Sequence, residues 1–483
     1  MSEAIKGLKP EILWQYFAEI SDIPRCSKHE DAIRAYLIDV AKRNNLEYET
    51  DAIGNVAIRI PAKPGKENAP MVTMQSHMDM VCEKNKGTVH DFMTDPIKLV
   101  RDGDHITADG TTLGADNGIG IAAGLAFINS DIQHGPLEIL TTTDEETGLT
   151  GAFNIDPAIV KGRLMLNLDS EEFGYIYVGC AGGANVDMHL PLEFTAPAEN
   201  MTGARIILDG LKGGHSGCDI QLNRGNAALL LNRFMQAAAD KLNIGLAAIN
   251  SGDKHNAIPR EAEADIAIAQ ADIAALTDLA ATLREDFATE LSTDSTLKIT
   301  VESMDAPARI MTPESMNSVL NLLLAIPHGP LQMSNDIPGL VQTSTSMAVV
   351  NTRDAELFVQ NSPRSSIDVQ IMQVVEQLKA IIVLAGGTAD NISSYPGWKP
   401  DIHSPLLETA SKVSEELFGK PFAVTAIHAG LECGVIGSRI PGLDKISIGP
   451  DIDNPHSPDE YVGIESTEKF FAYLERLLET LAQ

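Results

Sequence analysis

Helix-like and strand-like apolar patterns alternate along the first 170 residues of this chain. Residues 28–43 place apolar side chains at helical spacing, and residues 113–130 read as a turn followed by a helix rich in small residues. Short strand-like runs are expected around these helices, at 55–61, 70–81, 136–143 and 163–170. Alternation of this kind is typical of an α/β fold whose strands form a largely parallel sheet.

The pattern changes near residue 185 and returns near residue 396. In between, long helical segments stand next to alternating strands, as at 222–242 and 261–270. A chain of 483 residues is also too long for one ordinary core. We therefore predict an α/β main domain, with a mixed, largely parallel sheet between helices, made of residues 1–184 and 396–483. An α+β lid domain is predicted to be inserted at 185–395.

The charge of the chain restricts its partners. Its formal net charge is −31, and no run of basic residues is longer than "AKR". Nucleic acid and anionic membranes both bind basic surfaces, so neither is an expected partner. The N-terminal residues also lack the apolar segment of a secretion signal, and no stretch approaches the ~20 apolar residues that span a bilayer.

The cysteines indicate a reducing compartment. The five cysteines are scattered, odd in number, and form no C-x-x-C pair. This pattern argues against both a disulfide framework and a zinc site built from cysteines. We therefore expect a cytoplasmic protein.

Histidines and acidic residues stand where the predicted strands end. His77 and Asp79 close one strand, three adjacent carboxylates at 144–146 follow the next, and Asp169 follows a third. Active sites of open α/β sheets lie outside these carboxyl ends. Adjacent carboxylates repel one another unless they are solvated or face a cation. The position of the carboxylates at 144–146 therefore raises the possibility of a bound metal.

Two further residues extend this set. Asp116 lies in the turn before a predicted helix, and His456 lies in "NPHSPDE" near the C-terminus. Imidazole and carboxylate groups are zinc ligands, and carboxylate-rich sets can hold two divalent ions about 3.5–4 Å apart. Each feature alone is ordinary, because an H-x-D, an acidic turn or a histidine between prolines is common without metal. Their combination at the ends of one sheet favours a two-metal hydrolase.

A dinucleotide-binding site is the rival interpretation of one segment. Gly118, Gly120 and Ala123 fit the spacing of the dinucleotide fingerprint. That fingerprint must follow a hydrophobic strand, whereas the preceding "DGDHITADGTTLGAD" is polar and turn-like. The sequence context therefore argues against this interpretation.

A series of motifs carries a family resemblance. In order along the chain, "SHMDMV", "GTTLGADNGIG", "TTDEETG", "LNLDSEE", "LKGGHSG" and "SIGPDIDNPHSPDE" together resemble the aminoacyl-histidine dipeptidases. These enzymes belong to the dinuclear zinc peptidases that include carboxypeptidase G, aminoacylase and carnosinase. The resemblance extends from the N-terminus to the last helix.

The resemblance implies a ligand set for two divalent ions. Zn²⁺ is expected, with Co²⁺ or Mn²⁺ as alternatives. His77 and Asp169 would bind one ion, His456 and Glu146 would bind the other, and Asp116 would bridge both. Some relatives have Glu where this chain has the shorter Asp169.

The resemblance also implies the remaining catalytic roles. Glu145 would be the general base of a metal-bridged hydroxide mechanism, and Asp79 would hold the ring of His77. In the lid, His215 would face the oxyanion, in several relatives across a dimer interface. Asn256 and Arg364 would bind substrate, because a guanidinium matches a free carboxylate. His428 and Glu432 also lie in a family motif and receive no role.

The resulting prediction is a cytoplasmic, homodimeric metallo-dipeptidase that cleaves unblocked dipeptides, with Xaa-His substrates such as carnosine as the implied class. Two alternatives stay open. One is an N-acyl amino acid amidohydrolase of the same fold and metal set. The other is a non-catalytic protein that binds divalent cations, against which the intact Glu145 argues.

Overall fold

The computed structural model describes residues 3–483, which divide into two compact units. Of the described residues, unit 1 comprises 3–180, Trp398–Ala426 and Leu431–Gln483. Unit 2 comprises Ala181–Gly397 and the short segment Ile427–Gly430. The chain therefore passes twice from unit 1 into unit 2 and back, once through a long insertion and once through a loop of four residues.

Unit 1 is built around an eight-stranded sheet with the strand order β1-β2-β6-β3-β7-β23-β8-β22. The neighbours β6, β3, β7 and β23 run parallel, whereas β2 is antiparallel to β6 and β8 is antiparallel to β23. The predicted α/β fold with a mixed sheet is therefore confirmed, with the parallel strands at its centre. The strands of this sheet are β1 (Glu47–Thr50), β2 (Val56–Ile60), β3 (Val72–His77), β6 (Leu137–Thr142), β7 (Leu164–Asn167), β8 (Tyr175–Cys180), β22 (Ala423–Ile427) and β23 (Asp444–Ser447).

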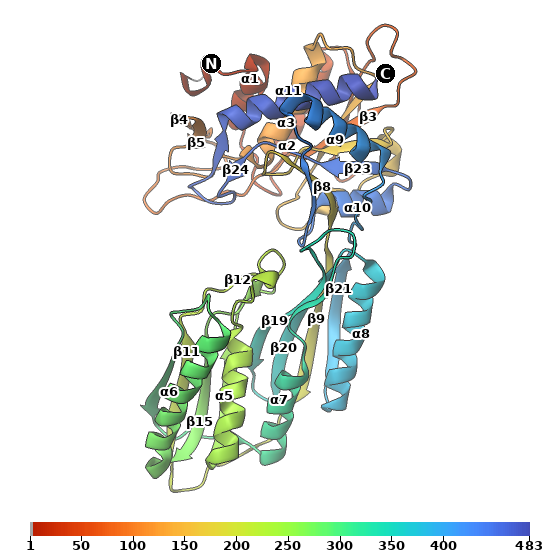
Figure 1. Ribbon diagram of the computed structural model, residues 1–483. Helices are drawn as coiled ribbons and strands as arrows, with labels where there is room; N and C mark the ends of the chain where they lie inside the picture. The colour runs from red at the N-terminus through yellow and green to blue at the C-terminus, as the bar shows by residue number, and fades with distance from the viewer. Residues whose placement is uncertain (1–2) are drawn as a thin grey trace. The chain divides into compact units, whose positions relative to one another are not determined.

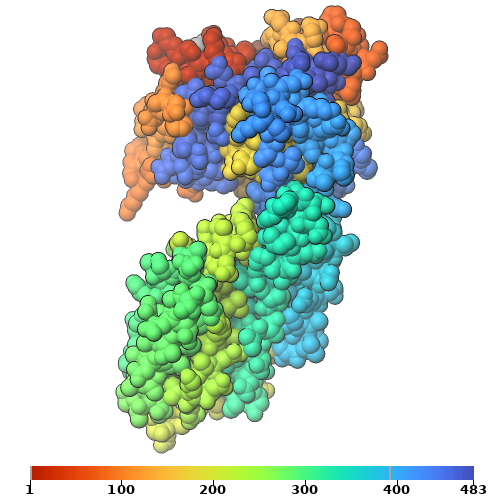
Figure 2. All heavy atoms as spheres, in the orientation of Figure 1, coloured from red at the N-terminus to blue at the C-terminus, as the bar shows by residue number. Residues whose placement is uncertain are grey.

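A small antiparallel sheet joins distant parts of unit 1. Its strands β4 (Leu99–Asp102) and β5 (His105–Ala108) pair with β25 (Tyr461–Gly463), which pairs with β24 (Ile452–Asp453). Figure 2 shows N-terminal and C-terminal segments side by side on the surface of unit 1. The helices of the unit are α1 (Glu11–Ser21), α2 (Asp31–Arg43), α3 (Ala115–Ala126), α4 (Thr150–Phe153), α9 (Pro405–Phe418), α10 (Glu432–Arg439) and α11 (Ile464–Leu481).

The helices of unit 1 follow from local sequence. α2 buries Ile33, Leu37 and Val40, which share one face because helical residues three and four apart are neighbours. α9 begins where the side chain of Ser404 accepts a hydrogen bond from the backbone of Leu407, and it ends at Gly419 in the left-handed conformation. Within the described residues, no helix has both the length and the apolar character to span a membrane.

Unit 2 is an antiparallel sheet whose helices lie along one face (Figure 1). Its strand order is β16-β11-β15-β13-β19-β20-β9-β21, with β18 paired to β19. Its helices are α5 (Ala227–Lys241), α6 (Ile273–Glu290), α7 (Pro313–Ala325) and α8 (Asp368–Leu384). The sheet strands are β9 (Gly182–Pro191), β11 (Met201–Asp209), β13 (Ile244–Ser251), β15 (Ala262–Ala269), β16 (Lys298–Met304), β18 (Gly329–Met333), β19 (Val341–Thr352), β20 (Glu356–Ser365) and β21 (Thr388–Tyr395).

Two short strand pairs complete unit 2. β10 (Phe194–Thr195) pairs with β17 (Ile310–Met311), and β12 (Gly214–His215) pairs with β14 (Ala257–Ile258). A continuous apolar core lies between the sheet and its helices, and Phe234 and Phe287 are among its largest buried side chains. Unit 2 thus has the α+β character that the sequence predicts for the inserted segment.

One pair of cysteines forms a disulfide that the sequence analysis did not predict. Cys26 and Cys82 form a disulfide across 56 residues of sequence, whereas Cys180, Cys218 and Cys433 remain thiols. The cysteine pattern argues against a disulfide framework, and it did not predict this single bond. The physical reason is tertiary, because a backbone bridge between Cys26 and Met80 brings the segment after α1 beside the segment after β3.

Candidate metal centre

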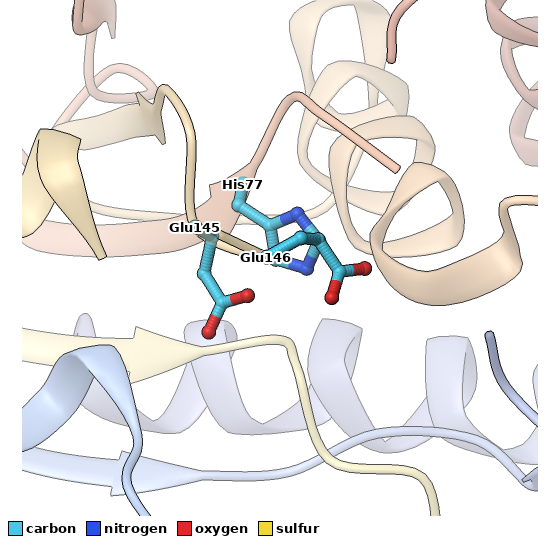
Figure 3. Close-up of side chains that lie close together, drawn as sticks. All are labelled: His77, Glu145 and Glu146. Carbon is cyan, nitrogen blue, oxygen red and sulfur yellow. The ribbon is translucent and has the colours of Figure 1, made fainter. Parts of the chain in front are cut away.

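Three neighbouring parallel strands place the predicted ligands at one edge of the sheet. His77 is the last residue of β3 and stands opposite Thr142, the last residue of β6. On the other side of β3, Gln75 pairs with Asn167 at the end of β7. The loops that carry Glu146 and Asp169 therefore leave the sheet next to His77. Figure 3 shows the His77 ring close to the carboxylates of Glu145 and Glu146.

Asp116 lies between the two predicted histidine ligands. Its Oδ1 is 2.9 Å from His77 Nε2, and its Oδ2 is 3.1 Å from His456 Nε2. His77 Nε2 is also 3.3 Å from Asp169 Oδ1, and His456 Nε2 is 2.9 Å from Glu146 Oε2. The five side chains thus form two groups that share Asp116. Each group brings an imidazole and two carboxylates within reach of one cation.

The burial of these groups fits bound cations. Glu146 Oε1 and Asp169 Oδ1 are buried, and neither has a hydrogen-bond partner among the described residues. Asp169 Oδ1 has only its 3.3 Å contact with His77 Nε2. Buried polar atoms in proteins nearly always have a partner, so the unpartnered Glu146 Oε1 fits a bound cation. The His77 side chain is 1% exposed, whereas that of His456 is 51% exposed. One group is therefore enclosed, and the other is open at His456.

The carboxylates of the site also stabilise positive charge beside them. Hydrogen bonds to Asp116 and Glu146 raise the pKa of His456 to about 11. Burial opposes protonation of His77, but the carboxylates of Asp169 and Asp116 outweigh it and raise its pKa. The carboxylates thus stabilise positive charge at both imidazoles. Divalent cations bound between these side chains would supply that charge.

Backbone geometry fixes Asp116 and His456. Asp116 lies in the first turn of α3, after Gly114, whose φ of 72° is left-handed. The side chain of Asn117 donates a hydrogen bond of 2.7 Å to the carbonyl of Leu168, beside Asp169. His456 lies in the β24–β25 loop with a φ of 62°, a conformation that only surrounding structure can hold in a residue other than glycine.

Asp79 holds the turn that carries two of the predicted catalytic residues. Its carboxylate accepts hydrogen bonds from the backbone N–H groups of Glu145 (2.9 Å) and Glu146 (3.2 Å), and from Ser27 Oγ (2.8 Å). His77 Nδ1 lies 3.2 Å from the backbone oxygen of Asp79 and 3.5 Å from its carboxylate. The residue therefore contacts both the ring of His77 and the turn of Glu145.

Glu145 lies in the same site with an altered acidity. Burial, together with the charges of Asp169, Glu432 and Glu146, raises its pKa well above the usual range for a carboxyl group. Glu432 is also buried, and its Oε2 accepts hydrogen bonds from Gln75 (2.5 Å) and Thr142 (2.7 Å). Burial and the neighbouring carboxylates thus make the carboxylate of Glu145 a stronger proton acceptor than an exposed glutamate.

A second acidic group beside the site is satisfied by hydrogen bonds. Glu30, Asp79 and Asp144 lie close together and are buried. Glu30 accepts hydrogen bonds from the backbone of Lys28 and Asp144, and Asp144 accepts them from the hydroxyl groups of two threonines. Of the three adjacent carboxylates at 144–146, Asp144 therefore supports the turn, while Glu145 and Glu146 face the site.

In unit 2, His215 is held as a neutral donor. Its Nδ1 accepts hydrogen bonds from the backbone N–H groups of Gly217 (3.2 Å) and Cys218 (3.0 Å). Burial and the charge of Arg364 lower its pKa to about 4. A neutral imidazole whose Nδ1 accepts carries its proton on Nε2, so this nitrogen is the donor.

The other two predicted lid residues lie near His215 in unit 2. Arg364 is 7% exposed, and its guanidinium donates to the hydroxyl groups of Tyr395 (2.9 Å) and Ser216 (3.5 Å). Its buried Nε has no hydrogen-bond partner among the described residues. Asn256 is exposed, and its carbonyl accepts a hydrogen bond of 2.8 Å from the backbone of Ser216. The three predicted lid residues thus lie close together in unit 2, and Arg364 is the positively charged one among them.

Two buried charges of the metal centre were missed by the sequence analysis. Arg25 and Glu460 contact the segments that carry Asp79 and Asp116, and their partners are backbone groups. Glu460 is the last residue of the motif "NPHSPDE", which is the one signal that could have drawn attention to it. Arg25 lies outside every motif of the series.

Comparison with known proteins agrees with the motifs. The profile of peptidase family M20/M25/M40 matches residues 73–480. The cytosol non-specific dipeptidase of Escherichia coli (strain K12) is 40% identical over 483 residues, which are 100% of this chain and 99% of that protein. The crystal structure of aminoacylhistidine dipeptidase from Vibrio alginolyticus is 40% identical with a TM-score of 0.90, and the match covers 98% of this chain and 97% of that chain.

A more distant structure shares the fold. The aminopeptidase PepT from Bacillus cereus ATCC 10987 is 17% identical with a TM-score of 0.57, and the match covers 99% of this chain and 100% of that chain. The resemblance inferred from the motifs is therefore confirmed at the level of the whole chain. By its profile, its full-length relatives and its fold, the chain belongs to peptidase family M20/M25/M40.

Proposed function

We propose that this protein is a two-metal dipeptidase that hydrolyses unblocked dipeptides, Xaa-His dipeptides among them. The placement of Asp116, with one carboxylate oxygen toward His77 and the other toward His456, carries this proposal. The names of two relatives, a non-specific dipeptidase and an aminoacylhistidine dipeptidase, support the substrate class. His77 and Asp169 would hold one ion, and His456 and Glu146 the other.

Each group of the site would have its own role in peptide hydrolysis. Two bound cations, with Zn²⁺ as the first choice, would activate a water molecule and polarise the scissile carbonyl. Glu145 would accept the proton of that water and return it to the leaving nitrogen as the carbon–nitrogen bond breaks. Asp79 would keep Glu145 in place through the backbone N–H group that it binds.

Unit 2 would supply the groups that recognise substrate. His215 would donate from Nε2 to the oxyanion, since its Nδ1 already accepts two backbone N–H groups. Arg364 and Asn256 would bind the free carboxylate of the dipeptide. We further propose a homodimer located in the cytoplasm. Sedimentation of the purified protein and fractionation of the source cells test these two points.

The variant Glu145→Gln tests the proposed chemistry. It keeps the size of the side chain and removes its ability to accept a proton. We expect unchanged metal content and a kcat lower by about 10²–10⁴-fold on dipeptides. Near-normal kcat would exclude Glu145 as the base.

A substrate panel separates the alternatives. The wild-type protein is assayed on carnosine, other Xaa-His dipeptides and N-acetyl amino acids, with and without a chelator. We expect dipeptide cleavage that the chelator abolishes and added Zn²⁺, Co²⁺ or Mn²⁺ restores. Turnover of acyl amino acids alone would indicate an amidohydrolase. Metal binding without turnover of any of these substrates would indicate a cation-binding protein.

A further inference from the structure

Glu460 is a buried carboxylate that binds backbone rather than a charged side chain. The residue is 1% exposed. Its Oε2 accepts hydrogen bonds from the N–H groups of Leu113 (2.8 Å) and Gly114 (2.9 Å). Its Oε1 accepts them from Ala115 (2.7 Å) and Asp116 (3.3 Å). One side chain thus satisfies four consecutive N–H groups at the start of α3, where the helix itself offers no acceptor.

The buried guanidinium of Arg25 binds carbonyl groups in and near the same turn. Arg25 is 2% exposed, and its guanidinium donates to the carbonyl oxygens of Gly114, Asp79 (2.8 Å) and Met78 (3.2 Å). A Cβ atom on Gly114 would lie 2.6 Å from Arg25 Nη2, and its φ of +72° also favours glycine. The peptide groups before Asp116 are therefore fixed between a carboxylate and a guanidinium.

Glu460 joins two segments that carry proposed metal ligands. It follows His456 by four residues in the β24–β25 loop, and its bonded N–H groups lead directly to Asp116. Its own carbonyl accepts a hydrogen bond of 2.8 Å from Thr107 Oγ1 in β5. The facing ligand atoms, His456 Nε2 and Asp116 Oδ2, lie 3.1 Å apart. The loop of the half-exposed His456 is thus tied to Asp116 through Glu460.

We propose that Glu460 is a positioning residue that sets the geometry between His456 and Asp116, and so the affinity of the cation site that these two share with Glu146. This inference rests on the proposed two-metal function. It assigns Glu460 no contact with metal or substrate. The ion held by His77 and Asp169 depends less on Glu460, because those two ligands come from the ends of neighbouring strands of the sheet.

The variant Glu460→Gln isolates the hydrogen bonds from the volume of the side chain. A glutamine fills the same space, but its NH₂ group would face N–H donors in place of an acceptor. The turn before Asp116 would then lose at least two of its four hydrogen bonds. Asp459→Asn is the matched control, since it removes the same charge from an exposed neighbour in the same loop.

Metal binding to the full chain is the measurement. Each protein is stripped with a chelator and titrated with Zn²⁺, and bound metal is counted. A parallel titration with Co²⁺ follows the visible spectrum. We expect two ions in the wild-type protein and in Asp459→Asn. In Glu460→Gln we expect the ion at His456 and Glu146 to bind about 10–100-fold more weakly, and the ion at His77 and Asp169, which shares Asp116, to lose clearly less affinity. At saturating metal, KM should equal that of the wild type.

The results of these titrations distinguish an error about Glu460 from an error about the proposed two-metal function. Two ions bound by Glu460→Gln with wild-type affinities, or equal weakening of both, would overturn the role of Glu460. A wild-type chain that does not bind two ions would overturn the proposed function and this inference with it. If Glu460→Gln does not fold, Glu460→Asp takes its place. That variant keeps the charge on a shorter side chain, and the same selective weakening of the ion at His456 and Glu146 is expected.

Discussion

Asp79 Oδ1 accepts a hydrogen bond of 2.9 Å from the backbone N–H of Glu145, so a residue two positions after His77 fixes the turn of the proposed general base. The same carboxylate binds the N–H of Glu146. Asp79 therefore supports the proposed ligands His77 and Glu146 and the proposed base Glu145. In our proposal Asp79 itself contacts neither substrate nor cation. Such supporting groups are as sensitive to substitution as the ligands they orient.

The variant Asp79→Asn should therefore lower activity. An asparagine can offer one oxygen to the two N–H groups, and its NH₂ group would face the other donor. We expect kcat to fall by about 10–100-fold with KM little changed. Steady-state kinetics on a dipeptide measures this. Ser27→Ala, which removes one donor to the same carboxylate, is the control and should retain most activity. Wild-type kcat in Asp79→Asn would show that the turn holds Glu145 without it.

Arg364→Lys should weaken recognition of a free carboxylate. A lysine has one ammonium group in place of the planar fork, and it cannot bind a carboxylate bidentately. We expect KM for dipeptides to rise about tenfold or more, while the matching dipeptide amides change little. Arg353→Lys, at an exposed arginine that precedes β20, is the control. An equal change for acids and amides would assign Arg364 a structural role.

Loss of the Cys26–Cys82 disulfide should destabilise unit 1. The bond closes a loop of 56 residues, and the entropy of such a loop corresponds to about 4 kcal/mol in the unfolded chain. The double variant Cys26→Ser/Cys82→Ser should unfold at lower urea concentration, and a reductant should shift the wild-type protein in the same direction. Cys218→Ser, at an exposed thiol, should leave the urea midpoint unchanged. A midpoint that does not respond to reductant would contradict this prediction.

His428 should make the stability of unit 2 depend on pH. Burial, with the charge of Arg364, lowers its pKa to about 3 in the folded protein, compared with about 6.5 in an unfolded chain. As pH falls below 6.5, the unfolded chain binds a proton that the folded protein does not bind. Stability present at pH 7.5 is therefore lost on acidification, by about 2 kcal/mol at pH 5.

The variant His428→Gln tests this contribution. Glutamine does not titrate, so the loss of stability between pH 7.5 and pH 5 should be smaller in the variant than in the wild-type protein. Urea unfolding at the two pH values measures the difference. His403→Gln, in an exposed turn, is the control. An identical pH dependence in wild type and His428→Gln would show that His428 is protonated without cost in the folded state.

The sequence predicted those helices and strands whose pattern of apolar residues can be recognised within a few residues. The strand of His77 and the helix at 31–43 have apolar periods that can be read within a few residues. The mixed sheet and the inserted α+β unit follow from the order of such elements. The proposed ligands could also be named from sequence, because imidazole and carboxylate groups at strand ends are rare in combination.

The features that sequence analysis missed depend on tertiary structure. β19 is a largely buried strand, yet "VQTSTSMAVVNT" is rich in serine and threonine and lacks an apolar alternation. The partner of Cys26 is distant in sequence and becomes its neighbour only through the pairing of two loops. Arg25 and Glu460 bind carbonyl and N–H groups, which every residue carries, so no residue type marks their partners.

The distribution of the proposed ligands along the chain has a consequence for biosynthesis. His77, Asp116 and Asp169 are all synthesised before unit 2, whereas His456 follows Asp116 by 340 residues. Domains generally fold as they emerge, N-terminal parts first. A nascent chain could therefore hold one cation early, but it must complete almost all of its synthesis before the second cation finds its ligands. Only a chain whose synthesis is almost complete could therefore bind both cations.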